Sequence, residues 1–317
     1  MIKYQVLTFV MTLFIYSSCN QVVDEVVEHE DRNEKLINDS SNQLKNTFIP
    51  PELPSSIVFA SEKIPLQSLD IKEGLDRELV VNNFWHSNTF FYFKRANRWF
   101  PIMKEILEEE GIPTDFLYLA VIESGLTQAT SPSGAKGFWQ FMPSTATDYD
   151  LEVNQNVDER MHIAKSTRAA CKYLKKAYDK LGSWVLAAAG YNRGVNGISR
   201  AIESQQVDNF FDLRLNEETS RYVYRIIALK MIMENPEEYG FYFTESNLYP
   251  PYKTKSVEVT QTIPDLVAWS LEQDITLKTL TLLNPWIKGT SLVVSRNKSY
   301  EILLPENTEQ LSPYKGL

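Results

Sequence analysis

Apolar residues recur every three and four positions through the middle of the chain, which is the periodicity of a helix with one buried face. The pattern predicts helices over residues 99–111, 112–125, 159–182, 183–192 and 216–235. Gly111 and Gly125 close the first two segments, at positions where helices commonly end. We therefore expect residues 75–245 to form one mainly α-helical domain.

The pattern changes after a proline-containing stretch at residues 247–255, which is typical of a linker. Downstream, "SVEVT", "SLVVS" and "SYEILLP" predict strands, and "IPDLVAWSLEQD" and "LKTLTLLNP" predict two short helices. We expect a small β-α-α-β module over residues 256–305. The predicted fold class is therefore mainly α, followed by a small α/β module.

The first residues have the pattern of an export signal, because Lys3 precedes an apolar run over residues 6–15 and small residues come before Cys19. The run is shorter than the roughly 20 residues that span a bilayer. A buried N-terminal helix is the alternative. The segment "YSSC" resembles a lipobox, which implies a signal peptide over residues 1–18 and a lipid anchor on Cys19. Residues 19–74 are polar, acidic and then proline-rich, so we expect a solvated tether.

Composition excludes several classes of protein. The net charge is -9 and no run of Lys and Arg interleaved with aromatic residues occurs, so we expect no nucleic acid partner. A lipidated Cys19 leaves Cys171 without an intramolecular disulfide partner, so we expect a buried free thiol. The histidines are far apart without an H-E-x-x-H motif, and no glycine-rich nucleotide motif is present. We therefore expect no metal site and no cofactor.

Glu123 is the one carboxylate within residues 116–146. Apolar residues stand three, four and seven positions before it, so Glu123 shares their face in the last turn of its predicted helix. Burial on that face and the negative end of the helix dipole both favour the protonated acid and raise its pKa. A general acid needs such a pKa at neutral pH. The alternative is an ordinary helix-end glutamate that reaches solvent past Gly125.

The segment over residues 131–146, "SPSGAKGFWQFMPSTA", combines small-residue turns with aromatic side chains in one loop. Gln140 offers both a donor and an acceptor, while Phe138, Trp139 and Phe141 offer flat apolar faces. This mixture suits a neutral, hydroxyl-rich and N-acetylated sugar. The alternative is a buried aromatic loop capped by Gln140.

Four motifs in order, "ESGL", "SPSGAKGFWQFMPSTA", "AAGYNRG" and "EETSRYV", resemble the successive motifs of the family 1 lytic transglycosylases, especially the membrane-bound type D branch. The resemblance covers about residues 75–240. It implies a lysozyme-like helical fold, peptidoglycan glycan strands as substrate, and cleavage of the β-1,4 bond between N-acetylmuramic acid and N-acetylglucosamine. It also implies that Glu123 is the single catalytic acid/base. The residues implied to orient this acid, line the sugar subsites or shape the cleft are Ser124, Ser131, Gln140, Met142, Tyr191, Asn192 and Tyr222.

Most glycosidases use two carboxylates about 5 to 9.5 Å apart. The local sequence supplies no second one, since the next acidic residue after Glu123 is Asp148. The family's solution implies that the muramic acid 6-hydroxyl attacks and leaves a 1,6-anhydro end. A non-catalytic peptidoglycan-binding protein remains an alternative. So does a hydrolase similar to goose-type lysozyme, for which Asp148, Asp150 and Glu218 are the first candidates for a second base.

The C-terminal module, with "LTLLNPW" over residues 280–286, resembles a LysM glycan-binding module but lacks the usual Gly-Asp-Thr near its first helix. An accessory domain that only packs on the catalytic one is the alternative. Asn20 after Cys19 implies the periplasmic face of the outer membrane by family-level sorting rules. The expected location is therefore the cell envelope.

Overall fold

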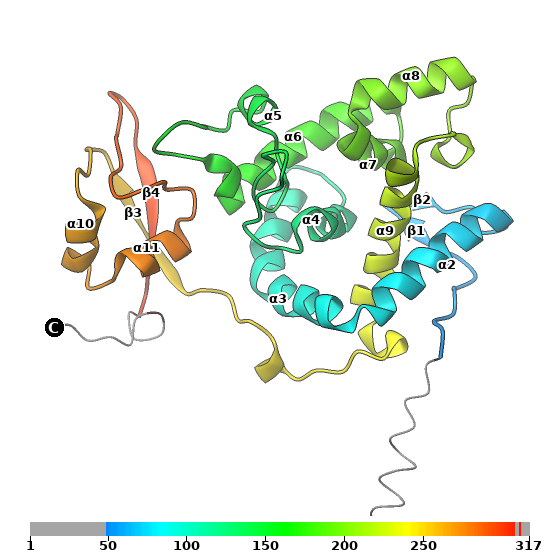
Figure 1. Ribbon diagram of the computed structural model, residues 1–317, viewed down its shortest axis with the longest axis horizontal. Coiled ribbons are helices and arrows are strands. Elements are labelled where there is room, and N and C mark those ends of the chain that lie inside the picture. The colour runs from blue at the N-terminus through cyan, green and yellow to red at the C-terminus, as the bar shows by residue number, and fades with distance from the viewer. Residues whose placement is uncertain (1–48, 308–310, 312–317) are drawn as a thin grey trace, which may run out of the picture. The chain divides into compact units, whose positions relative to one another are not determined.

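The structure is a computed structural model that describes residues 49–307 and 311 (Figure 1). The expected signal peptide, Cys19 and most of the expected tether lie outside the described residues. Every helix and strand described below belongs to one compact unit, Pro51–Leu317. Within the part of the chain that is described, no helix has the length and apolar character needed to cross a bilayer.

The folded body begins before the expected boundary at residue 75. Strand β1 (Val58–Phe59) pairs antiparallel with β2 (Glu62–Lys63), and the Phe59 side chain is fully buried in the main core. Glu62 accepts a hydrogen bond from Ser183 Oγ at 2.6 Å and a second one from the Trp184 amide. The short hairpin is therefore part of the domain, and its two-residue strands are too short to give a periodic pattern.

The helical domain contains the following α-helices in the described chain: α2 (Leu69–Phe84), α3 (His86–Glu109), α4 (Leu117–Ser124), α5 (Pro143–Asp148), α6 (Ile163–Leu181), α7 (Trp184–Arg193), α8 (Val195–Gln205) and α9 (Glu217–Glu234). Short 3-10 turns lie at Thr114–Phe116, Glu159–Met161, Phe210–Asp212, Pro236–Tyr239 and Glu245–Asn247. The mainly α-helical prediction is confirmed. The sequence pattern did not predict α2, because its inner face carries the buried polar residues Glu78, Asn82 and Asn83.

Helix α4 lies at the centre of the domain. Figure 1 shows it inside the ring made by α2, α3, α6, α7 and α9, and it contacts α3 and α9 directly. Its residues from Leu117 to Val121 are buried. The helix ends, as predicted, at Gly125, which has a left-handed φ of 60° and whose amide donates to the Val121 carbonyl at 2.8 Å. Because the helix ends at Gly125, Glu123 lies in its last turn.

The expected linker after α9 runs along α3. Arg98 donates to the Pro250 carbonyl at 3.0 Å, and its guanidinium lies 4.1 Å from the centre of the Tyr252 ring. The Tyr249 amide donates to the Lys94 carbonyl at 3.2 Å. The linker is thus attached to the helical domain at several points.

The C-terminal module consists of β3 (Thr254–Val259), α10 (Leu266–Glu272), α11 (Leu277–Leu283) and β4 (Tyr300–Pro305), which confirms the predicted β-α-α-β order. Strands β3 and β4 pair antiparallel. The segment "SLVVS" forms only an isolated bridge between Leu292 and Ile263 where we expected a strand. The module has its own apolar core, separate from the main one.

Candidate active site

Glu123 occupies the last turn of α4, where it accepts a hydrogen bond from the Tyr222 hydroxyl of α9. Burial raises the pKa of Glu123 to about 7, although the hydrogen bond from Tyr222 acts in the opposite direction. The pKa of Glu123 is thus raised, as expected, and burial is the largest of the causes that act on it. A carboxyl group with this pKa can give or take a proton at neutral pH.

Glu218, Tyr222 and Arg225 stand four and three positions apart on α9, which places them on one face of that helix. Because Tyr222 contacts Glu123, an anion lies one turn before this contact and a cation one turn after it. The negative charge of Glu218 raises the pKa of Glu123, and the positive charge of Arg225 lowers it. The proton affinity of Glu123 is thus set from both sides.

Asn192 holds the anionic side of this arrangement. Its Nδ2 donates to Glu218 Oε1 at 3.2 Å, and its Oδ1 accepts from Thr219 Oγ1 at 2.8 Å. The side chain therefore bridges the end of α7 to the first turns of α9. Glu218 is the candidate second carboxylate from the sequence that the structure brings toward Glu123.

Glu78 of α2 holds the cationic side. Its side chain is buried, accepts from Arg221 Nε at 2.6 Å, and lies 3.6 Å from Arg225 Nε. A buried carboxylate is expensive without such partners, so this pairing fixes α2 against α9. Glu78 and Arg225 were not predicted from the sequence. The signal that could have found them is Glu78 itself, a charged residue on the inner face of α2.

Residues 128–142 form a loop that we call the cleft loop. Ser124 Oγ lies 2.9 Å from the Phe138 carbonyl and 3.1 Å from the Ala120 carbonyl, so it ties this loop to the end of α4. Gln140 adopts a left-handed φ of 49°, and its Nε2 donates to the carbonyls of Gly137 at 2.8 Å and Ala129 at 3.2 Å. Both side chains hold the backbone of the loop.

The aromatic side chains of the cleft loop are not available to stack on a sugar. Phe138, Trp139 and Phe141 are 1%, 0% and 3% exposed, so the expectation that they supply sugar-binding faces is wrong. They fill the core beneath the loop, and Trp139 Nε1 donates to Thr167 Oγ1 at 2.9 Å. The alternative interpretation, a buried aromatic loop held by Gln140, describes the structure.

The other expected site residues lie around this loop. Tyr191 Oη donates to the Trp139 carbonyl at 2.8 Å, and burial raises its pKa well above the usual value. Ser131 Oγ accepts from the Ala135 amide at 3.0 Å and lies 3.0 Å from Ser133 Oγ. Met142 exposes 40% of its surface at the start of α5 and can contact a ligand.

Two residues that the sequence left outside the site have structural roles. Cys171 is a buried free thiol, as expected, and burial raises its pKa to about 12. The His162 side chain caps α6 and stacks on Trp286 at 5.8 Å between ring centres. Burial lowers the pKa of His162 to about 4, so the ring is neutral at pH 7.

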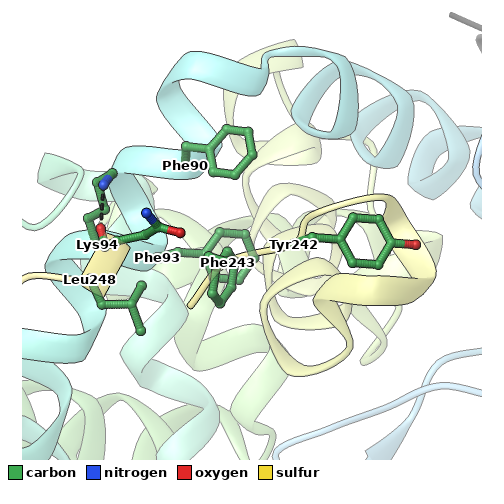
Figure 2. A pocket seen from close by; sticks show the side chains of 7 residues that line it. Phe90, Phe93, Lys94, Tyr242, Phe243 and Leu248 are labelled. Carbon is green, nitrogen blue, oxygen red and sulfur yellow. Dashed lines mark hydrogen bonds between the residues drawn. The ribbon is translucent and has the colours of Figure 1, made fainter. Parts of the chain in front are cut away.

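A pocket of about 280 Å³ lies where the segment after α9 packs on α3 (Figure 2). Its walls include Phe90, Phe93, Tyr242 and Phe243. None of the expected site residues lines it. The pocket is therefore separate from the candidate active site.

Residues 101–212 match the family model of the transglycosylase SLT domain, and residues 255–308 match that of the soluble lytic transglycosylase C-terminal LysM-like domain. The fold and the site thus define an SLT-type transglycosylase domain followed by a LysM-like module. The matches identify these two domains in the chain, and each covers less than half of it. The first matched segment contains Glu123, the cleft loop and Tyr191.

The chain is 29% identical over 253 residues to membrane-bound lytic murein transglycosylase D of Escherichia coli strain K12, which covers 76% of this chain and 53% of that protein. The same protein from E. coli O6:H1 matches equally. The chain spans about half the length of the curated relatives it matches. A solved structure of an inactive mutant of lytic transglycosylase Slt from Pseudomonas aeruginosa has 17% identity and a TM-score of 0.35, over 44% of this chain and 24% of that one.

Proposed function

We propose that the chain is a peptidoglycan lytic transglycosylase with Glu123 as its single acid/base. The observation that carries the proposal is a carboxyl group with a pKa of about 7, hydrogen-bonded by Tyr222 inside a domain that matches the SLT family. The substrate is the β-1,4 bond between N-acetylmuramic acid and N-acetylglucosamine.

In the first step, Glu123 gives its proton to the leaving glycosidic oxygen. Tyr222 donates to Oε1, so the proton is carried by Oε2. The Tyr222 hydroxyl and the positive charge of Arg225 then stabilise the carboxylate that forms.

In the second step, the carboxylate takes the proton of the muramic acid 6-hydroxyl while that oxygen bonds to the anomeric carbon. The products are a 1,6-anhydro end and a free 4-hydroxyl, and Glu123 is again protonated. No water enters the balance. Burial and the negative charge of Glu218 favour this return to the neutral acid.

Glu218 supports a second candidate, a hydrolase similar to goose-type lysozyme. It lies on the same face of α9 as Tyr222 and could activate a water as the second base. Products of hydrolysis carry a reducing muramic acid end and are one water heavier than anhydro products. The mass of the products therefore separates the two reactions.

The test is mass spectrometry of purified sacculi after digestion by the protein, with Glu123→Gln and Glu105→Gln in parallel. We expect 1,6-anhydro ends from the wild type and a loss of activity of about 10²- to 10⁴-fold in Glu123→Gln, which cannot transfer the proton. Glu105 is exposed on α3, so its substitution serves as the matched control.

Sedimentation with sacculi separates catalysis from binding in this test. Glu123→Gln should still bind sacculi, because its shape and hydrogen-bonding capacity are kept. Near-normal turnover by Glu123→Gln would rule out the catalytic assignment. Binding to sacculi without any cleavage by the wild type would favour the peptidoglycan-binding alternative.

We further propose that the protein acts in the cell envelope, held through a lipid on Cys19 at the periplasmic face of the outer membrane. The support is the "YSSC" segment together with the membrane-bound relative. Cys19→Ala should release the protein from the membrane fraction or leave an uncleaved precursor, because the acyl chains provide the membrane affinity. Cys171→Ala keeps Cys19 and should stay with the membrane.

A further inference from the structure

The segment between α5 and α6, residues 151–162, contacts both the cleft loop and the C-terminal module; we call it the connecting loop. We propose that the C-terminal module holds the cleft loop in place through the connecting loop, with Arg160 as the positioning residue that joins them. The effect expected on turnover rests on the proposed function, whereas the effect expected on loop order does not.

On the module side, Val157 of the connecting loop is fully buried in the core of the C-terminal module. It forms a bridge with Ile287. Two backbone hydrogen bonds flank this contact, from the Asp158 amide to the Trp286 carbonyl and from the Lys288 amide to the Asn156 carbonyl, both 2.8 Å long. The tip of the connecting loop therefore completes the core of the module.

Glu152 adds a polar contact at the start of the connecting loop. It accepts from Tyr300 Oη at 2.9 Å and pairs with Lys298 Nζ at 2.5 Å. Burial acts to raise the pKa of Glu152, but the hydrogen bonds from Lys298 and Tyr300 outweigh it and hold the pKa below its usual value. The ionised form is thus bound to β4 and to the residues just before it.

On the side of the cleft loop, Arg160 is 4% exposed, and all three nitrogens of its guanidinium group donate hydrogen bonds. Nη1 donates to the carbonyls of Gly134 at 2.8 Å and Phe141 at 3.1 Å, at two separate points of the cleft loop. Nε and Nη2 bind the two oxygens of Asp158, each at 2.8 Å. Asp158 neutralises the buried charge, so Arg160 joins the two loops without an unpaired ion.

Three further contacts keep the loops together. Lys136 of the cleft loop lies 3.3 Å from Asp158, and Gly137 packs on the Arg160 carbonyl. A Cβ at position 137 would lie 1.9 Å from that carbonyl oxygen, so only glycine permits this approach. Gln128 donates to the Met161 carbonyl at 2.8 Å.

Contacts within the connecting loop couple Val157, on the side of the C-terminal module, to Arg160, on the side of the cleft loop. It is closed by a bridge between Val153 and Asp158, and Asn154 Oδ1 accepts from the Val157 amide at 2.8 Å. Val157 and Arg160 are therefore parts of one small ordered unit. The cleft loop in turn reaches Ser124, the neighbour of Glu123, through the Phe138 carbonyl.

The consequence for the reaction is a positioning effect. The hydrogen bonds of the Arg160 side chain go to backbone carbonyls of the cleft loop and to Asp158, so its loss should disturb the geometry beside Glu123 without removing a group that touches the substrate. We therefore expect turnover to fall more than apparent affinity.

The test uses the full-length protein with Arg160→Lys and, separately, Val157→Ala. Amide hydrogen exchange is measured at Ser131, Gly134 and Gly137, whose amides close hydrogen bonds inside the cleft loop. We expect both variants to exchange about tenfold faster or more at these amides. Val293→Ala, a substitution of an exposed valine in the C-terminal module, is the matched control and should leave exchange unchanged.

The kinetic readout on sacculi should show kcat reduced about tenfold, with KM changed by about twofold or less. Unchanged exchange in Arg160→Lys would overturn the role of Arg160. Unchanged exchange in Val157→Ala would overturn the proposal that the C-terminal module holds the cleft loop in place. This variant tests that proposal even if Arg160→Lys fails to fold. Because exchange needs no substrate, these outcomes stand even if the proposed function fails.

Discussion

The hydroxyl of Tyr222 donates a hydrogen bond to Oε1 of Glu123, joining α9 to the last turn of α4 across 99 positions of the chain. This contact gives the carboxylate a fixed partner. The same helix face places Glu218 and Arg225 one turn to either side. The ionisation of Glu123 is therefore the property that most directly reports on the site.

The pH dependence of activity should follow the pKa of Glu123, which burial raises to about 7. In the proposed reaction Glu123 must start protonated, so kcat/KM on sacculi should fall as pH rises through about 7. A profile from pH 5 to 9 measures this. A plateau that continues to pH 9 would contradict the assignment.

Protein stability should depend on the same group. Between its ordinary value of 4.5 and about 7, Glu123 binds more protons in the folded state than in the unfolded state, so its contribution to the free energy of unfolding falls as pH rises through this window. Glu123→Gln removes that contribution. The Tm of Glu123→Gln relative to that of the wild type should therefore increase as pH rises from 4.5 to 8. A constant Tm difference would show that burial does not perturb the group.

Tyr222→Phe tests the hydrogen bond alone. The bond from Tyr222 lowers the pKa of Glu123, so its loss should move the alkaline limb of the activity profile to higher pH. Activity at the optimum should fall about tenfold, because the carboxylate formed in the first step loses a charge-assisted hydrogen bond. Tyr224→Phe, on the same helix, is the control, since Tyr224 packs against Phe210. Equal profiles for both variants would exclude this role.

Glu218→Gln and Arg225→Gln should shift the alkaline limb in opposite directions. Loss of the negative charge of Glu218 lowers the pKa of Glu123, and loss of the positive charge of Arg225 raises it. Arg225→Lys keeps the charge and should shift the limb least. If Glu218→Gln instead loses about 10²-fold or more in activity, Glu218 is a catalytic second carboxylate and the hydrolase is favoured.

Truncation after Tyr249 should leave a helical domain that melts cooperatively, because none of the described residues beyond that point belongs to the main core. The truncated protein should still be less stable, by about 1–3 kcal/mol, since Val157 loses its apolar surroundings. Calorimetry measures both properties. A broad, non-cooperative transition would show that the two parts depend on each other to fold.

The sequence predicted α4, α6, α7 and α9 and the second half of α3, but it missed α8, although the buried residues of that helix are apolar. Helix α4 and its end at Gly125 follow from spacing and glycine chemistry, and the inward placement of Glu123 follows from that helix. Helix α2 was not predicted, because Glu78, which pairs with arginines 143 positions or more away, interrupts its apolar face. Long-range ion pairs leave no periodic signal.

The candidate site could be predicted only in part. Periodicity placed Glu123, but composition misassigned Phe138 and Trp139, because an aromatic residue in a loop can face a ligand or the core. Arg160 was invisible for a different reason. Its partners in the cleft loop are backbone carbonyls 19 and 26 positions away, and a carbonyl carries no sequence identity.

The β1–β2 hairpin has a mechanical consequence for a chain held at its N-terminal side. Tension on residue 49 would reach this hairpin before it reached the helices, because Phe59 is buried and Glu62 is bound at the start of α7. Detaching the hairpin from the core would require separating Phe59 from Phe116. The two ring centres lie 5.5 Å apart, and Phe116 directly precedes α4. If the chain is held through Cys19 as proposed, this buried attachment of the hairpin would bear a pull from the N-terminal side before α4 and Glu123 do.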